Sequence, residues 1–259
     1  MNEPSRILAV DAGNTRVKWG IHDGREWFLR ASFGTMAGDE TAFSHLPPDP
    51  QVNRIIVSNV AGKQVGERIR DALYRVGPPI EFIQSQTEQC GVTSRYELPD
   101  TLGTDRWAAL IAAFNSCATQ TAPRRAPSPM LVVMAGTALT IDALTAEGVF
   151  LGGVIVPGLA LMRAALHRGT AQLPADSGEY QTFPCNTVDA ISAGSIEACA
   201  GAVQRMFTHL SAESGALPRC IGSGGAIHVV SAHLPFPVAI NDNLVLDGLI
   251  AIARDARAL

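Results

Sequence analysis

The sequence has little charge, and its cysteines follow no pairing pattern. Charged residues make up 17% of the 259 residues, the formal net charge is −4 and no long basic run occurs. Binding to nucleic acid or to an anionic membrane surface therefore gains no electrostatic support. The cysteine number is odd and no CxxC pair occurs, which argues against a disulfide framework or a zinc site and favours a reducing, cytoplasmic compartment. The five cysteines are Cys90, Cys117, Cys185, Cys199 and Cys220.

Long apolar runs and common functional patterns are also missing. No stretch of about 18 apolar residues occurs, so we expect no membrane span. The first residues lack a basic stretch followed by a long apolar segment, so we expect no signal peptide. The Walker sequence GxxxxGK[ST] is absent, which disfavours a P-loop enzyme. The histidines show no metal-ligand spacing, and we interpret them as surface or structural residues: His22, His45, His167, His209, His228 and His233.

Hydrophobic residues make up 47% of the chain, which is ample for a globular core. The first segments alternate between apolar, β-branched runs and turns rich in Gly, Asp and Asn, which predicts a strand meander with short connections. A strand, a helix, a short strand and a second helix should follow. The expected elements are strands at 6–11, 16–21, 26–33, 54–60 and 81–83, and helices at 63–76 and 104–117.

A stretch rich in Pro, Ala and Thr, residues 120–129, is the best candidate boundary. The opening pattern of strand, Gly-containing polar turn, strand, turn and strand returns after it. This internal echo predicts a duplicated α/β chain with halves at 1–119 and 120–259. In the second half we expect strands at 130–134, 139–144 and 150–156, and helices at 159–167, 187–210, 226–233 and 244–258.

Two turns at equivalent points of the halves carry residues suited to phosphate. Asp11 to Thr15 forms the first, with Lys18 in the next strand, and Gly136 to Thr140 forms the second. Such turns offer backbone N–H groups and hydroxyls to a phosphate, and the Asp could hold a metal ion. Either turn alone also reads as a plain hairpin. Together they predict a cleft in which both turns grip one polyphosphate.

Three further motifs admit a functional and a structural interpretation. Asp105 and Arg106, in the sequence GTDR, open a helix: they could supply a base and a cation for an anionic substrate, or merely match the helix dipole. Thr187 precedes a long helix and could be an ordinary N-cap. The glycine-rich segment 222–225 could admit a nucleotide, or could be a tight turn between a strand and a helix.

Taken together, these segments resemble the type III pantothenate kinases over nearly the whole chain. Each block alone is unspecific, but their order and separation fit the family. The matching blocks are DAGNTRVK at 11–18, GTDR at 103–106, GTALTID at 136–142, FLGGVIVPG at 150–158, TAQLP at 170–174 and NTVDAISAG at 186–194.

The resemblance implies a duplicated actin-like fold, the ribonuclease-H-like fold of the acetate and sugar kinase, Hsc70 and actin superfamily. It also implies ATP-dependent phosphorylation of pantothenate, with a divalent ion such as Mg²⁺, in a homodimer. Asp105 would be the catalytic base. The residues that would contact ATP are Asp11, Ala12, Gly13, Asn14, Thr15, Arg16, Val17, Lys18 and Thr137. Those that would line the pantothenate pocket are Tyr96, Gly103, Thr104, Asp105, Arg106 and Thr187.

One position departs from the family pattern. The family usually carries an Asp three residues before the Thr of the second turn, where it binds a monovalent cation, K⁺ or NH₄⁺; here that residue is Met134. We therefore expect the monovalent cation site to be lost. Two other functions stay open at this point: a kinase for another small hydroxy or carboxylic acid, and a non-catalytic regulator that has kept the fold. The retained Asp11, Lys18, Asp105 and Thr137 favour an enzyme.

Overall fold

The structure is a computed structural model that describes residues 6–36, 43–47, 50–118, 128–174 and 178–255. Contacts within the chain define two compact units. The first comprises residues 1–120 and 243–259, and the second comprises residues 121–242. The final helix therefore belongs to the first unit, although it is the last element of the sequence. The division into duplicated halves at 1–119 and 120–259 stays a prediction, and residues 119–127 of the expected boundary lie outside the described residues.

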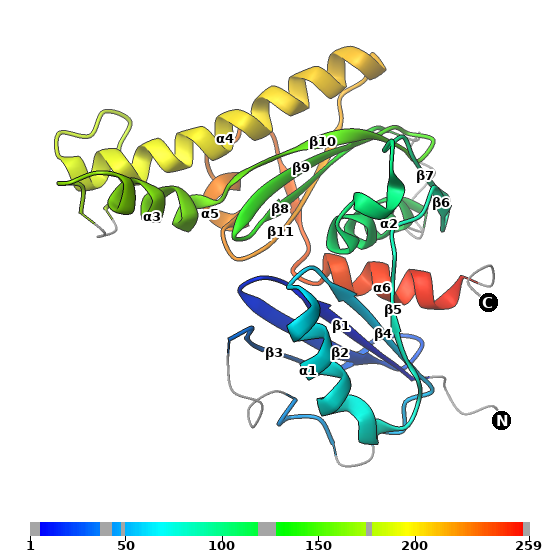
Figure 1. Cartoon of the computed structure of the whole chain (residues 1–259). Coiled ribbons are helices and arrows are strands. Elements are labelled where there is room, and N and C mark those ends of the chain that lie inside the picture. The colour runs from blue at the N-terminus through cyan, green and yellow to red at the C-terminus, as the bar shows by residue number, and fades with distance from the viewer. Residues whose placement is uncertain (1–5, 37–42, 48–49, 119–127, 175–177, 256–259) are drawn as a thin grey trace. The chain divides into compact units, whose positions relative to one another are not determined.

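The sheet of the first unit combines an antiparallel meander with a parallel extension (Figure 1). Strands β1, β2 and β3 run antiparallel in sequence, and β4 and β5 then extend the other side of β1 as parallel strands. The order across the sheet is β3 (Trp27–Gly34), β2 (Arg16–His22), β1 (Ile7–Ala12), β4 (Arg54–Asn59) and β5 (Ile80–Phe82).

Alternation along β1 and β4 divides the sheet into two faces. One face carries Val10 and Val57, which are buried against Ile69 of helix α1 (Lys63–Leu73). The opposite face carries Asp11 and Ser58 at the carboxyl ends of these strands, and helices α2 (Thr104–Ala118) and α6 (Leu244–Arg254) cover it. This second face holds the candidate active site.

Helices α2 and α6 cross very closely. A Cβ atom built on Gly248 of α6 would overlap the carbonyl oxygen of Ala108 in α2. Glycine at 248 is thus required for backbone contact between the two helices. One residue before Ala108 in α2, the indole of Trp107 donates a hydrogen bond to Gln89 Oε1 at 2.8 Å and lies fully buried. Gln89 belongs to the hairpin of β6 (Glu88–Gln89) and β7 (Val92–Ser94), which the sequence did not predict.

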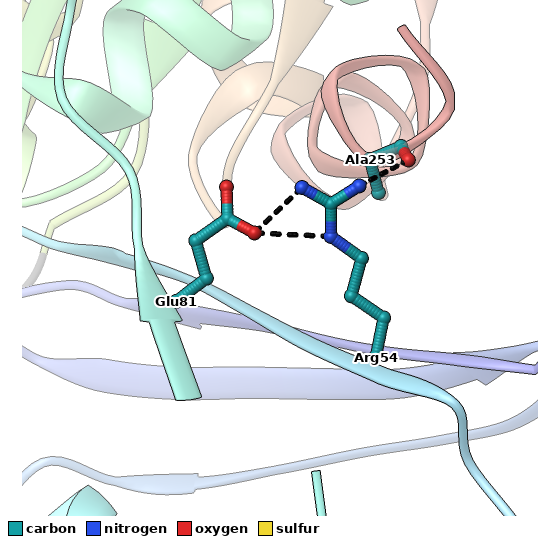
Figure 2. A network of polar contacts seen from close by, with 3 residues as sticks. All are labelled: Arg54, Glu81 and Ala253. Atoms are coloured by element: carbon teal, nitrogen blue, oxygen red, sulfur yellow. Dashed lines mark hydrogen bonds and ion pairs between the residues drawn. The ribbon is translucent and has the colours of Figure 1, made fainter. Parts of the chain in front are cut away.

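The carboxyl end of α6 is fixed to the sheet by polar contacts. Figure 2 shows Arg54 between Glu81, whose Oε2 lies 2.6 Å from Nη2, and the carbonyl oxygen of Ala253 at 2.5 Å. An arginine on a helix-terminal carbonyl satisfies a group that has no partner within the helix. Arg254 in turn donates to Gly24 O at 2.6 Å and lies 3.2 Å from His22 Nδ1. These contacts explain why the last helix packs with the first unit.

The second unit repeats the strand order of the first. Its meander of β8, β9 and β10 is antiparallel, and β11 and β12 extend the other side of β8 as parallel strands. The order is β10 (Val149–Pro157), β9 (Ala138–Leu144), β8 (Met130–Ala135), β11 (Arg219–Ser223) and β12 (Val238–Ile240). The same order and directions in both units confirm the predicted duplicated fold.

Helices cover one face of this second sheet. Val133 and Ile141 of the sheet are buried against Val203 of α4 and Ile227 of α5. The helices of the unit are α3 (Leu159–Gly169), α4 (Thr187–Ser214) and α5 (Ile227–Ser231). Within the described residues, no helix is both long enough and apolar enough to span a bilayer.

Most predicted elements appear within one to three residues of their expected bounds. The expected helix at 63–76 ends as an α-helix at Leu73 and continues as a 3-10 turn, Tyr74–Val76, before Gly77 at φ 118°. A second 3-10 turn, Pro99–Thr101, precedes α2. The expected helix at 187–210 runs one turn further, to Ser214, where Gly215 in the left-handed region ends it.

Candidate active site

The candidate site begins where β1 and β4 end beside the first turn of α2. Asp11 and Ser58 pair in the parallel register, so their side chains share the face that α2 covers. The Ser58 hydroxyl lies 2.9 Å from the Thr104 hydroxyl. Asp105 follows directly in the first turn of α2 and interacts electrostatically with Asp11. The fold thus brings together two predicted motifs that lie more than 90 residues apart in the sequence.

Asp11 is half-buried, and its Oδ1 atom is fully buried. Burial raises the pKa of Asp11 to about 7, the Asp105 carboxylate adds to the rise, and Lys18 opposes it. Lys18 lies opposite Asp11 in the β1–β2 register. Within the described residues, Asp11 Oδ1 is buried and has no hydrogen-bond partner. A buried carboxylate oxygen without a donor is costly, so this atom is suited to a cationic ligand.

The Asp105 carboxylate lies against Gly103, in the turn that precedes α2. Its Oδ1 accepts a hydrogen bond from the Arg106 N–H at 2.8 Å, and a Cβ atom at Gly103 would lie 2.7 Å from the same oxygen. Glycine at 103 therefore leaves the space that the carboxylate occupies. Burial raises the pKa of Asp105, and the Arg106 N–H and guanidinium oppose the rise. The group is thus a stronger base than an exposed Asp.

Arg106 and Tyr96 lie together beside this carboxylate. Arg106 Nη1 lies 3.5 Å from the Tyr96 hydroxyl, and its guanidinium carbon lies 5.9 Å from the ring centre. The Arg106 side chain is 95% buried, its exposed fraction being 5%. A buried guanidinium presents a fixed fork that matches a carboxylate. The structure therefore places Tyr96 next to the GTDR turn. That these residues line one pocket stays a prediction.

The first predicted phosphate turn connects β1 and β2. The Gly13 N–H donates to Arg16 O at 3.0 Å, and the Thr35 hydroxyl donates to Gly13 O at 2.6 Å. Asn14, Thr15 and Arg16 are exposed at its tip, whereas Ala12 and Val17 are buried in the strands. The turn is therefore rigid at its base and accessible at its tip.

The second predicted phosphate turn has the same construction in the second unit. The Gly136 N–H donates to Ala138 O at 3.0 Å, and Thr137 is exposed. The Gly158 N–H donates to Thr137 O at 2.9 Å, which ties the turn to the start of α3. Whether the two turns grip one polyphosphate stays a prediction.

Thr187, the first residue of α4, lines an apolar pocket in the second unit. Asn186, not Thr187, is the N-cap: its Oδ1 accepts from the Asp189 N–H at 2.9 Å. Thr187 is exposed and lines a pocket of about 920 Å³ with Met162, Leu166 and Ile191 among its walls. Thr187 therefore lines a pocket instead of capping the helix, and its role in binding pantothenate stays a prediction.

Asp189 holds the segment that forms one wall of this pocket. Its carboxylate accepts from Glu179 N at 2.8 Å, from Gln181 Nε2 at 3.3 Å and from Asn186 Nδ2 at 2.6 Å. These three donors all lie within residues 178–186. Asp189 therefore fixes that segment across the first turn of α4.

Some residues of these sites were not predicted from the sequence. Ser58 contacts Thr104, and the sequence signal was a polar residue near the end of an otherwise apolar strand. Asn186 Oδ1 accepts from the Asp189 N–H, and Asn186 Nδ2 donates to the Asp189 carboxylate. Their N-x-x-D spacing was visible in the sequence. Among the described residues, no three His, Cys, Asp or Glu side chains cluster closely enough to hold a metal ion by themselves.

Comparisons with known proteins agree with this architecture. A profile of the family described as type III pantothenate kinase matches residues 7–209. A type III pantothenate kinase of Dechloromonas aromatica is 42% identical over 249 residues, which cover 95% of this chain and 98% of that protein. One of Aromatoleum aromaticum is 44% identical over 254 residues, with 97% and 99% covered.

A solved structure confirms the fold independently of close sequence similarity. Component A of the (R)-2-hydroxyglutaryl-CoA dehydratase of Acidaminococcus fermentans superposes with a TM-score of 0.52 at 13% identity and covers 96% of each chain. Together with the repeated strand order, this confirms the predicted duplicated actin-like fold. With its family profile and close relatives, the chain belongs to the type III pantothenate kinase family.

Proposed function

We propose that this protein transfers the γ-phosphoryl group of ATP to the primary hydroxyl of pantothenate, the first step of coenzyme A biosynthesis. The observation that carries the proposal is the meeting of Asp11 and Asp105 at one sheet edge, in a chain of this kinase family. Family membership indicates the substrate. Of the two carboxylates, Asp11 can bind a cation and Asp105 can accept a proton. The alternatives, a kinase for another acid and a regulator without catalysis, lack a comparable observation.

In this proposal, Asp105 accepts the proton of the attacking pantothenate hydroxyl. Its raised pKa brings it nearer to the operating pH, where a general base is most effective. Arg106 binds the pantothenate carboxylate, with Tyr96 beside it. Gly103 and Thr104 form the adjoining wall, and Gly103 keeps the base in place. Phosphoryl transfer depends mainly on such positioning and on charge stabilisation.

The first turn and Thr137 bind the phosphates of ATP in this proposal, through exposed N–H groups and hydroxyls. The residues near Asp11 fit a divalent ion such as Mg²⁺, because Asp11 Oδ1 is buried and has no donor. Mg²⁺ commonly uses one or two carboxylates, with phosphates and waters as its other ligands. Such an ion would neutralise phosphate charge when bound. Lys18, opposite Asp11, supplies a fixed positive charge from the chain itself.

We also propose a homodimer, in which Thr187 completes a pantothenate pocket. Supporting this, α4 carries small exposed residues at Gly194, Ala198 and Gly201, spaced to lie on one side of the helix. Small residues permit close approach of a second helix. A cytoplasmic location is part of the proposal. It is supported by the free thiols of the described cysteines, at positions 90, 185, 199 and 220.

The direct test is an assay of ADP release coupled to a dehydrogenase, with ATP, Mg²⁺ and pantothenate. We expect release that depends on pantothenate, with phosphate on its primary hydroxyl by mass spectrometry. Glucose, mannose and acetate serve as competing acceptors. A protein prepared with Asp105→Asn controls for contaminating kinases. ADP release with a sugar or acetate but not with pantothenate would overturn the assignment.

A further inference from the structure

We propose that two buried serines, Ser58 and Ser85, are positioning residues that hold the Gly103 turn and thereby aim Asp105. This inference rests on the proposed function in one respect: it takes Asp105 as the base. Ser58 lies near the end of β4, and Ser85 lies three residues after β5. Since β4 and β5 are neighbouring parallel strands, both serines lie toward the same edge of the sheet.

Each serine contacts one side of Gly103. The Ser58 hydroxyl lies 2.9 Å from the hydroxyl of Thr104, which follows Gly103. The Ser85 hydroxyl donates to the carbonyl oxygen of Leu102, which precedes Gly103, at 2.9 Å. Their exposed fractions are 0% and 5%, respectively. A buried hydroxyl is tolerated when it is hydrogen-bonded, and here both bonds are made to the turn.

The turn gains from contacts outside α2 because it lies at the start of a helix. The first N–H groups of any helix lack partners within it. Here the first helical bond runs from Trp107 N to Gly103 O at 3.0 Å. The Asp105 carboxylate rests against Gly103 and on the Arg106 N–H, so its direction follows the backbone of the turn. A displacement of about 1 Å in a reacting group can cost about 100-fold in rate.

A merely structural role predicts a different result from a positioning role. In that case each lost hydrogen bond would lower the melting temperature, and an enzyme that is still folded would turn over at the normal rate. A positioning role predicts a lower kcat in a protein that is fully folded at the assay temperature. The KM for ATP should change little in Ser85→Ala, because the Ser85 hydroxyl bonds to Leu102 O and not to a residue of the phosphate turns.

The first experiment compares Ser58→Ala and Ser85→Ala with the wild-type full chain at 25 °C. We expect kcat to fall about 10- to 100-fold, with circular dichroism and thermal melting showing folded protein. Ser58→Cys, which keeps a weak donor, should have an intermediate kcat and guards against loss of folding in the alanine variant. Ser116→Ala is the matched control: its hydroxyl donates to Ala113 O at 2.7 Å in the same helix, far from the turn. It should leave kcat unchanged.

A double-mutant cycle with Asp105→Asn tests whether the serines act through the base. If they do, Ser58→Ala should have almost no further effect on the residual rate of Asp105→Asn, because effects on one catalytic unit are not additive. Wild-type kcat in both alanine variants, or losses that multiply fully with Asp105→Asn, would overturn the proposal.

Amide hydrogen exchange gives a readout that needs no activity. We expect exchange at residues 103–107 to accelerate in both alanine variants, and exchange at 110–116 to stay as in the wild type. Unchanged exchange at 103–107 would also overturn the proposal. If the wild type showed no pantothenate-dependent ADP release, the proposed function would fail, while the exchange result would still decide whether the serines hold the turn.

Discussion

Replacing Gly248 by alanine should disturb both stability and catalysis, because this glycine sets the distance between α6 and α2. The added Cβ would fall well inside the 3.0 Å that real Cβ atoms essentially never breach, and it would meet the rigid backbone carbonyl of Ala108. The helices must therefore separate. Ala108 lies three residues after Asp105, so a shift of α2 displaces the proposed base.

The magnitude follows from two opposing effects. Overpacking a buried contact costs about 1–3 kcal/mol, and replacing glycine by alanine within a helix returns about 0.5–1 kcal/mol. We therefore expect a net loss of about 1–2 kcal/mol in the free energy of unfolding, seen as a lower urea midpoint. A shift of α2 by about 1 Å should also lower kcat about 10- to 100-fold.

The assays are urea unfolding followed by circular dichroism, and coupled ADP release with pantothenate. Gly169→Ala is the matched control, because Gly169 is the last residue of α3 and its Cβ would meet nothing within 4 Å. It should be neutral or slightly stabilising. Wild-type stability and wild-type kcat for Gly248→Ala would refute the close crossing and its link to Asp105.

Three further predictions concern the proposed base Asp105, the buried His22 and Met134, which replaces the family's cation ligand. Asp105→Asn should lower kcat about 10²- to 10⁴-fold without unfolding; a near wild-type rate in the coupled assay would leave Asp105 a helix-dipole role only. Burial, and to a lesser degree Arg254, lowers the pKa of His22 in the folded protein. The neutral side chain therefore contributes stability above about pH 6.5, and this contribution is lost as the pH falls toward the folded pKa. The difference in urea midpoint between wild type and His22→Asn should decline from pH 7 to pH 5, and a constant difference would contradict this. Met134 is a neutral thioether and a poor ligand for a hard cation, so rates at fixed Mg²⁺ and ionic strength should be similar in sodium, potassium and ammonium chloride; strong activation by potassium would show that other ligands rebuild the site.

The sequence by itself determined most of the local structure and the family. Alternating apolar residues and Gly-containing turns predicted both meanders, because hydrophobic period and turn chemistry are local properties. The blocks around Asp11, Asp105 and Gly136 predicted a duplicated kinase fold. The strand order, the family profile and the relatives confirmed this. The short strands β6 and β7 escaped prediction because two or three residues show no clear period.

Only the tertiary structure decided which distant residues meet, since such contacts depend on strand register and helix packing rather than on neighbours in the chain. Parallel pairing of β1 with β4 put Ser58 beside Asp11, and the placement of α2 brought Thr104 to Ser58. The raised pKa of Asp11 likewise follows from burial and from Asp105, which no local pattern encodes. The last helix packs with the first unit through the contacts of Arg54 and Arg254 and through the close approach of Gly248 to Ala108, and these contacts exist only when the elements are in place.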